Sequence, residues 1–224
     1  MADIEKLELA PPTKIERFAE LAAVITSAAP WIGGPVAEII GGVATNLKIN
    51  RVIEFVQSVL EHVEALHTKR SEEFVKSEDF ADILEKTTQA VADERHEAKR
   101  RLFSNYILNN ISHPEISYDQ RLKCLRLLSQ VDIRHIDLLG ALRQTPSKAE
   151  LNLSMSAPIT TLGRRVPNLE NELNEVVHVT NTLGLTNVQN TYLRTNMTGA
   201  GAADLRHAVT SLGCEFLTFI SAVE

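Results

Sequence analysis

"DFADILEKTTQAVADERHEAKRRLFSNYILNNI", residues 79–111, is the longest helical pattern in this 224-residue sequence. Ser77 precedes it as a helix cap, and His113-Pro114 ends it because proline cannot continue a helix. The length fits either one long helix or two helices in series. The apolar residues of the stretch recur on one helical face, and they are Phe80, Ile83, Leu84, Val91, Ala98, Leu102, Tyr106 and Ile111.

Apolar residues recur at helical spacing on both sides of this stretch as well. Residues 13–29 and 51–67 each predict an amphipathic helix, and residues 117–143 predict two short Leu-rich helices. The sequence therefore predicts a mainly α protein with a helical bundle over residues 14–143, preceded by a flexible N-terminus, residues 1–13. The expected buried face of the second helix consists of Val52, Phe55, Val56, Val59, Val63 and Leu66.

The character of the sequence changes near residue 145. Residues 144–167 are polar and punctuated by proline, so we predict a linker there. Residues 168–224 alternate helical and strand-like patterns, which predicts a small C-terminal winged-helix-like α+β module. Its expected parts are a helix capped by Asn168 and ended by Gly184, strands over 185–197 and 205–210 joined by a flexible tip at residues 198–204, and a closing helix.

Composition excludes several classes of protein. A hydrophobic share of 44% and a charged share of 23% are those of an ordinary globular protein. The net charge of −6 is uneven: residues 1–94 hold 9 Lys/Arg against 17 Asp/Glu, and residues 95–224 hold 14 against 12. An acidic N-terminal half disfavours general nucleic-acid binding, which requires neutralised phosphates. Two cysteines without a shared motif predict neither a disulfide framework nor a zinc site.

The most apolar segment, "AAPWIGGPVAEIIGGV" at residues 28–43, carries a single charge, at Glu38, and overlaps an uncharged stretch. Residues 21–37 carry no charge, and as a helix they would extend about 26 Å against a hydrocarbon core of about 30 Å. Proline and glycine near the middle would break such a helix, so a single membrane span is disfavoured. We predict the bend of an apolar helical hairpin, with a membrane or oligomer contact at Trp31, Ile32, Ile39 and Ile40.

No motif in the sequence predicts catalysis, a metal or a cofactor. The glycine-rich "GAGAAD" at residues 199–204 has Asp204 where a dinucleotide turn has its third small residue, and a strand rather than a helix is predicted to follow it. The carboxylate–His pairs at Glu64/His67 and Asp93/His96 lie in heavily charged, solvated surroundings rather than in a bundle core. The helix that a winged-helix regulator would insert into DNA is acidic, and the predicted wing offers only Arg194 and Arg206.

A basic cluster at Arg95, Lys99, Arg100 and Arg101 is the remaining charged feature, and it continues at Arg121, Lys123 and Arg126. Glu97 stands four residues before Arg101, so part of the cluster is expected to be compensated surface. Charge runs of this kind are generally solvated faces. The alternative is a dock for an acidic partner, such as the acidic N-terminal half of a second copy.

Two stretches together resemble a known bacterial pattern. "ERHEAKRRLFSNYILNNIS", followed by "YDQRLKCLRLLSQVDIRHIDLLGALR", joins a charged helix to two Leu-rich helices. "HVTNTLGLT" and "HAVTSLGCEFLTFI" are similar to the usual ending of the same proteins. The chain thus resembles the uncharacterised bacterial proteins of the abortive-infection alpha type over about half its length. The resemblance implies an all-helical protein of anti-phage defence with a terminal winged-helix-like unit, and it transfers no catalytic residues.

These observations predict a non-enzymatic, cytoplasmic interaction or regulatory protein. Its expected partner is another protein, either a second copy or a product of the same operon, and nucleic acid is disfavoured. Two alternatives stay open. One is a membrane-perturbing effector that inserts the apolar hairpin 14–47 when activated, and the other is a winged-helix DNA-binding regulator.

Overall fold

The computed structural model describes residues 49–169 and 171–223, and in these residues all regular structure is helical. The chain divides into two compact units, Met1–Arg95 and His96–Glu224. The mainly α class predicted from the sequence is therefore correct. The division falls within the stretch for which a single bundle was predicted.

The N-terminal unit, in its described part, contains helices that pack around α5. These elements are α3 (Ile49–Val63), η1 (Glu64–Leu66), α4 (Lys69–Val75) and α5 (Glu78–Asp93), with α3 and α4 both in contact with α5. Five of the six residues predicted on the apolar face of α3 are buried, and Leu66 is half-buried. Ser77 caps α5 as predicted, by accepting a hydrogen bond from the backbone N–H of Phe80.

The long stretch around residues 79–111 forms two helices in series. α5 ends at Asp93, and α6 (Glu97–Ser112) begins after a break in which Glu94 and His96 are both extended. His96 provides no side-chain cap for α6. The change of backbone conformation over these residues coincides with the boundary between the two units.

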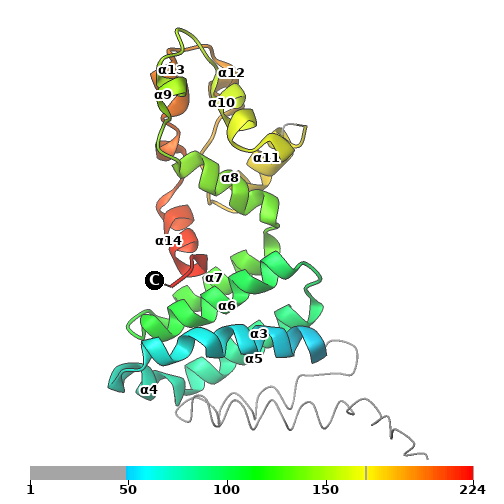
Figure 1. Cartoon of the computed structure of the whole chain (residues 1–224), viewed down its shortest axis with the longest axis vertical. Helices are drawn as coiled ribbons and strands as arrows, with labels where there is room; N and C mark the ends of the chain where they lie inside the picture. Colours follow the sequence, from blue (N-terminus) through cyan, green and yellow to red (C-terminus); the bar gives the residue numbers. More distant parts are fainter. Residues whose placement is uncertain (1–48, 170, 224) are drawn as a thin grey trace, which may run out of the picture. The chain divides into compact units, whose positions relative to one another are not determined.

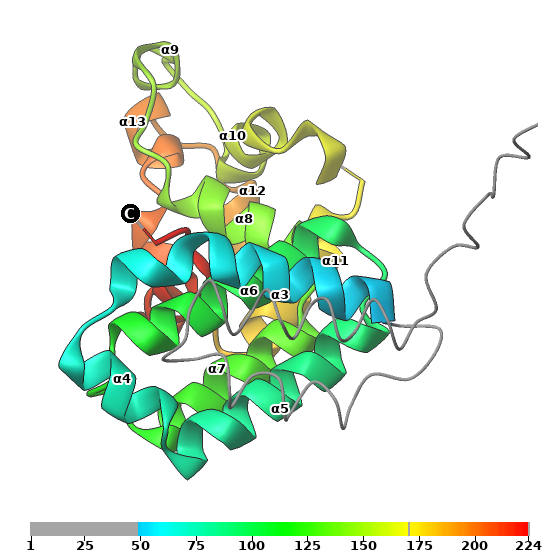
Figure 2. The ribbon, with the colours of Figure 1, turned by 60° about the horizontal axis from the view of Figure 1, so that its bottom comes forward.

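The C-terminal unit is built on α6 and on the helices that follow it (Figures 1 and 2). α14 packs against α6, α7 and α8, while α8 also contacts α10 and α11. α10 further contacts α12 and α13. The helices of this unit after α6 are α7 (Tyr118–Gln130), α8 (Ile133–Arg143), α9 (Lys148–Leu151), α10 (Pro158–Arg165), η2 (Pro167–Leu169), α11 (Leu173–Thr182), α12 (Asn190–Arg194), α13 (Gly199–Ala203), η3 (Arg206–Ala208) and α14 (Ser211–Ile220).

The winged-helix-like module is not what these residues form. The predicted strand 185–197 contains α12, and the predicted tip forms α13. Strand pairing in the described chain is limited to two isolated bridges, Ser156–Met197 and Thr186–Val209. β-branched and asparagine-rich sequence suggested strands, but strand propensity is easily overridden by tertiary packing. The predicted linker 144–167 likewise contains α9 and α10 and belongs to the same compact unit.

Gly199 shows why the predicted tip becomes a helix. Thr198 caps α13 by accepting a hydrogen bond from the N–H of Gly201. A Cβ atom on Gly199 would lie 2.4 Å from the carbonyl oxygen of Glu150 and 2.5 Å from that of Leu153. Glycine therefore allows α13 to lie directly against α9, and the N–H of Gly199 donates to Leu153 O at 3.0 Å.

The residues that carry the resemblance have packing roles at the α6–α14 contact. Asn105 donates from Nδ2 to Ile220 O at 3.0 Å, and Asn109 donates to Phe219 O at 3.0 Å and to Ser221 O at 2.8 Å. These carbonyls end α14 and would otherwise lack helical partners. Asn105 and Asn109 thus fasten the C-terminal end of α14 to α6.

Arg121 is a second structural feature that the sequence did not reveal. The sequence grouped it with exposed basic residues, but its side chain is 1% exposed. Its guanidinium donates to Asn110 O at 2.9 Å, to Asn110 Oδ1 at 2.7 Å and to His113 O at 2.9 Å. Arg121 therefore satisfies the last carbonyls of α6, which is a structural role.

Candidate anion-binding pocket

The hydrophobic site predicted from the sequence lies outside the described residues. Trp31, Ile32, Ile39 and Ile40 all fall in residues 1–48, so the membrane or oligomer contact stays a prediction. Among the helices described from residue 49 onward, none combines the length and the apolar character needed to cross a bilayer.

The basic cluster predicted as a dock is only partly exposed. Lys99 is buried, and its Nζ lies 3.3 Å from Ser129 O. Arg101 pairs with Glu97 at 2.5 Å in the i, i+4 arrangement expected from the sequence. Arg95 is exposed and Arg100 is half-buried, and both take part in further interactions. Because all four cations take part in interactions within the protein, the dock for an acidic partner stays a prediction that the geometry does not strengthen.

A pocket elsewhere in the C-terminal unit gathers two other arginines. It has a volume of about 490 Å³ and lies where α10, α11 and α12 meet. This volume is within the range of small-molecule sites, about 300–1,000 Å³. The lining residues are Ile159, Thr160, Gly163, Arg164, Leu173, Asn174 and Arg194.

Arg164 and Arg194 give the pocket its charge. Both side chains are exposed, and in the described chain neither has an ion pair or a hydrogen bond with a protein group. Each lies in the last turn of its own helix, α10 or α12. The negative end of a helix dipole favours a cation at that position, so the fold accommodates two guanidinium groups here without a carboxylate partner.

The remaining lining residues divide by chemistry. Thr160 and Asn174 bring a hydroxyl and an amide to the pocket, and Ile159 and Leu173 bring apolar side chains. A Cβ atom on Gly163 would meet nothing within 4 Å, so the space above this glycine is open. The pocket therefore combines positive charge, hydrogen-bonding groups and apolar surface, which is the usual make-up of a site for an amphiphilic ligand.

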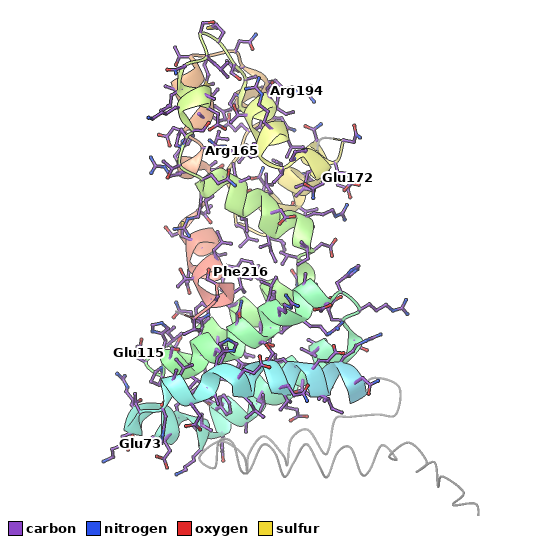
Figure 3. All side chains as sticks on the ribbon, viewed as in Figure 1. Glu73, Glu115, Arg165, Glu172, Arg194 and Phe216 are labelled. Atoms are coloured by element: carbon purple, nitrogen blue, oxygen red, sulfur yellow. The ribbon has the colours of Figure 1, made fainter. Side chains whose placement is uncertain are left out.

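The opposite face of α10 explains how the pocket is held in place. Thr161 and Leu162 are fully buried on that face. Arg165 is also turned inward: it donates to both carboxylate oxygens of Glu150, at 2.8 and 3.1 Å, and to the carbonyls of Ala141 and Ala203, at 2.8 and 3.0 Å. We call the pair of Arg165, which is labelled in Figure 3, and Glu150, together with the two carbonyls, the latch. The latch connects α10 to α8, α9 and α13.

Charge in the latch is compensated within the protein. The side chains of Arg165 and Glu150 are only 5% and 12% exposed. Hydrogen bonds from Arg165, helped by those from Ser147, lower the pKa of Glu150 to about 2. Glu150 therefore stays ionised at neutral pH, and the guanidinium of Arg165 is not available to a ligand.

No known protein family, curated protein or solved structure matches this chain.

The likeness to abortive-infection alpha proteins thus stays a prediction, and the pocket must be judged on its own geometry. Sequence reasoning missed it because Arg164 fell in a predicted linker and Arg194 in a predicted wing. The two arginines are brought together by α10 and α12, which are short helices without a strong sequence signal. The one usable signal was the doubled arginine at residues 164–165, which marks the end of α10.

Proposed function

We propose that this protein is a non-enzymatic regulatory protein that binds an anionic ligand in the Arg164–Arg194 pocket and acts through protein contacts. The observation that carries the proposal is the pair of guanidinium groups that share one pocket and have no protein partner in the described chain. Two cations of this kind gain most from an ion that fits between them, because guanidinium groups bind carboxylate and phosphate oxygens in a bidentate manner.

The contrast with Arg165 supports the assignment of a ligand. Arg165, the next residue, satisfies its donors with a carboxylate and two carbonyls of the protein. The described residues that line the pocket include no Asp or Glu, so Arg164 and Arg194 have no carboxylate partner there. The residues from 95 onward also carry a net positive charge, with 14 Lys/Arg against 12 Asp/Glu, which favours the approach of an anion.

A second feature supports action through protein contacts. Leu151 and Met155 are the exposed large hydrophobic side chains of the described chain, at 46% and 59% exposure. They lie on α9 and on the connection to α10, and the latch fixes α9 through Glu150. Exposed apolar side chains that form one patch favour a protein contact more than singly scattered ones do.

A titration of the full chain tests the binding function. Benzoate and phenyl phosphate are added at low ionic strength, and binding is measured by calorimetry. Because hydrogen bonds to charged groups contribute about 1.5–3 kcal/mol, we expect Arg164→Gln and Arg194→Gln each to weaken binding by about tenfold or more. Arg126→Gln is the matched control, since Arg126 is an exposed arginine on α7 that does not line the pocket.

Three results decide the outcome. Binding that is lost in both pocket variants and kept in Arg126→Gln supports the proposal. The proposal is overturned if neither benzoate nor phenyl phosphate binds, or if the pocket variants leave binding unchanged. Hydrolysis of phenyl phosphate followed by ³¹P NMR, if it disappeared in the same variants, would overturn the non-enzymatic part.

A further inference from the structure

We infer that the ligand of this pocket is a small phosphate monoester with an apolar body, an inference that rests on the proposed anion-binding function. The chemistry of the lining residues distinguishes it from a simple carboxylate. Charge, donor number and pocket size each contribute a separate argument.

Charge is the first argument. Arg164 and Arg194 together carry two positive charges, and the described lining residues include no carboxylate. A single carboxylate neutralises one of them and leaves the other in excess. A phosphate monoester carries a charge of about −1.5 to −2 at neutral pH, which matches both.

The number of hydrogen-bond donors is the second argument. Each guanidinium offers a planar set of N–H donors, and Thr160 and Asn174 add a hydroxyl and an amide. A carboxylate presents only two oxygens to so many donors. The phosphoryl group presents three, so it allows both arginines and one of the two polar side chains to bind at once.

Pocket size and apolar surface are the third argument. A volume of about 490 Å³ is far larger than an inorganic phosphate ion needs. The half-buried Ile159 and the buried Leu173 line the same space, and the open position above Gly163 leaves room beside them. An ester with an apolar or planar body occupies part of this volume, and both its own apolar surface and that of Ile159 are removed from water, which strengthens binding relative to the free ion.

Calorimetric titrations of the full chain with phenyl phosphate, inorganic phosphate and benzoate test the inference. We expect phenyl phosphate to bind at least tenfold more tightly than either of the other two at pH 7.5. The second ionisation of a phosphate monoester lies near pH 6. The affinity for phenyl phosphate should therefore fall several-fold between pH 7.5 and pH 5. The affinity for benzoate should stay nearly constant, because benzoate stays ionised over this range.

A steric variant tests the role of the apolar space without changing the charge. Gly163→Leu places a side chain in the open part of the pocket, and we expect it to weaken phenyl phosphate at least tenfold more than inorganic phosphate. Gly140→Leu is the matched control, because Gly140 also lies in a helix, on α8, with nothing within 4 Å of its Cβ position. Gly140→Leu should leave both affinities unchanged.

The outcomes separate the ligand class from the binding function. Equal affinity for benzoate and phenyl phosphate at pH 7.5 overturns the phosphate monoester and leaves anion binding intact. Absence of binding to all three probes overturns both. A phosphoserine peptide or a short oligonucleotide that binds more than tenfold tighter than phenyl phosphate, through the same arginines, overturns the small-molecule assignment.

Discussion

Arg164 and Arg165 are consecutive residues of α10, but they lie on opposite faces of this helix and differ in their hydrogen-bond partners. Arg165 is buried in the latch, where Glu150 and two backbone carbonyls satisfy its donors. Arg164 faces the pocket with Arg194 and has no protein partner in the described chain. An arginine whose N–H donors bond to protein groups stabilises the fold. An arginine whose donors have no protein partner is available for a ligand. The latch face should therefore control stability, and the pocket face should control binding.

The largest expected difference between the two faces concerns the arginines themselves. Arg165→Met leaves the carboxylate of Glu150 buried without its partner, so we expect the free energy of unfolding to fall by about 3 kcal/mol or more. Arg164→Gln, on the pocket face, should change it by less than about 0.5 kcal/mol. Urea unfolding followed by tyrosine absorbance measures both, because all three tyrosines lie in the C-terminal unit. Equal losses in the two variants would contradict the comparison.

The pH dependence of stability sharpens the same contrast. The pKa of Glu150 is lowered from 4.5 to about 2 in the folded state, so its contribution to stability is complete above pH 4.5 and is lost as the pH falls toward 2. The shift corresponds to about 3 kcal/mol. Glu150→Gln should be less stable than the natural chain at pH 7, and the gap should close by about pH 2. Glu175→Gln is the control, because Glu175 is an exposed residue of α11. If its difference in stability from the natural chain depended on pH to the same extent, the result would count against this role of the latch.

Two glycines extend the comparison to the backbone. Gly199 lies against α9 on the latch side, where a Cβ would clash with two carbonyl oxygens, so Gly199→Ala is expected to destabilise the C-terminal unit by about 2 kcal/mol. Gly163 lies in α10 above open space, so Gly163→Ala should stabilise the same unit by about 0.5–1 kcal/mol. Thermal unfolding of both variants measures the difference. Two changes of the same sign would break the comparison.

The smallest expected effect concerns a hydroxyl on the buried face of α10. Thr161 is fully buried, and its Oγ1 has no hydrogen-bond partner in the described chain. Thr161→Val removes this unsatisfied group and should stabilise the unit by about 1 kcal/mol. Thr180→Val is the control of opposite sign, since the buried Thr180 hydroxyl donates to Val176 O or Val177 O and accepts from Thr186. A loss of stability in Thr161→Val would contradict this expectation, because it would mean that the Thr161 hydroxyl makes a stabilising hydrogen bond.

The sequence predicted the parts of the fold that local signals determine. Apolar residues at helical spacing identified the buried face of α3, and Ser77 was correctly predicted to cap α5. Gly184 was correctly expected to end a helix, and its φ of 71° shows why glycine stands there. Asn168 was not the helix cap that was predicted, because Pro167–Leu169 forms a 3-10 turn and α11 begins only at Leu173.

The parts that depend on distant contacts were not predictable from one sequence. The helix α13 requires the contact between Gly199 and α9, and the burial of Arg121 requires the end of α6. The pocket depends on the meeting of α10 and α12, whose arginines lie thirty positions apart in the sequence. Local pattern identifies a charged residue, but only tertiary packing determines whether its donors are satisfied by the protein.

The most direct test of this account follows the arginine side chains during ligand binding. The full chain, labelled with ¹⁵N, is titrated with phenyl phosphate while the Nε–H resonances of its arginines are recorded. We predict that the resonances of Arg164 and Arg194 shift together and saturate with one affinity, while those of Arg165 and Arg126 stay in place. Shifts that are equal for Arg126 and Arg164, or that do not saturate, would contradict the claim that this pocket is a binding site.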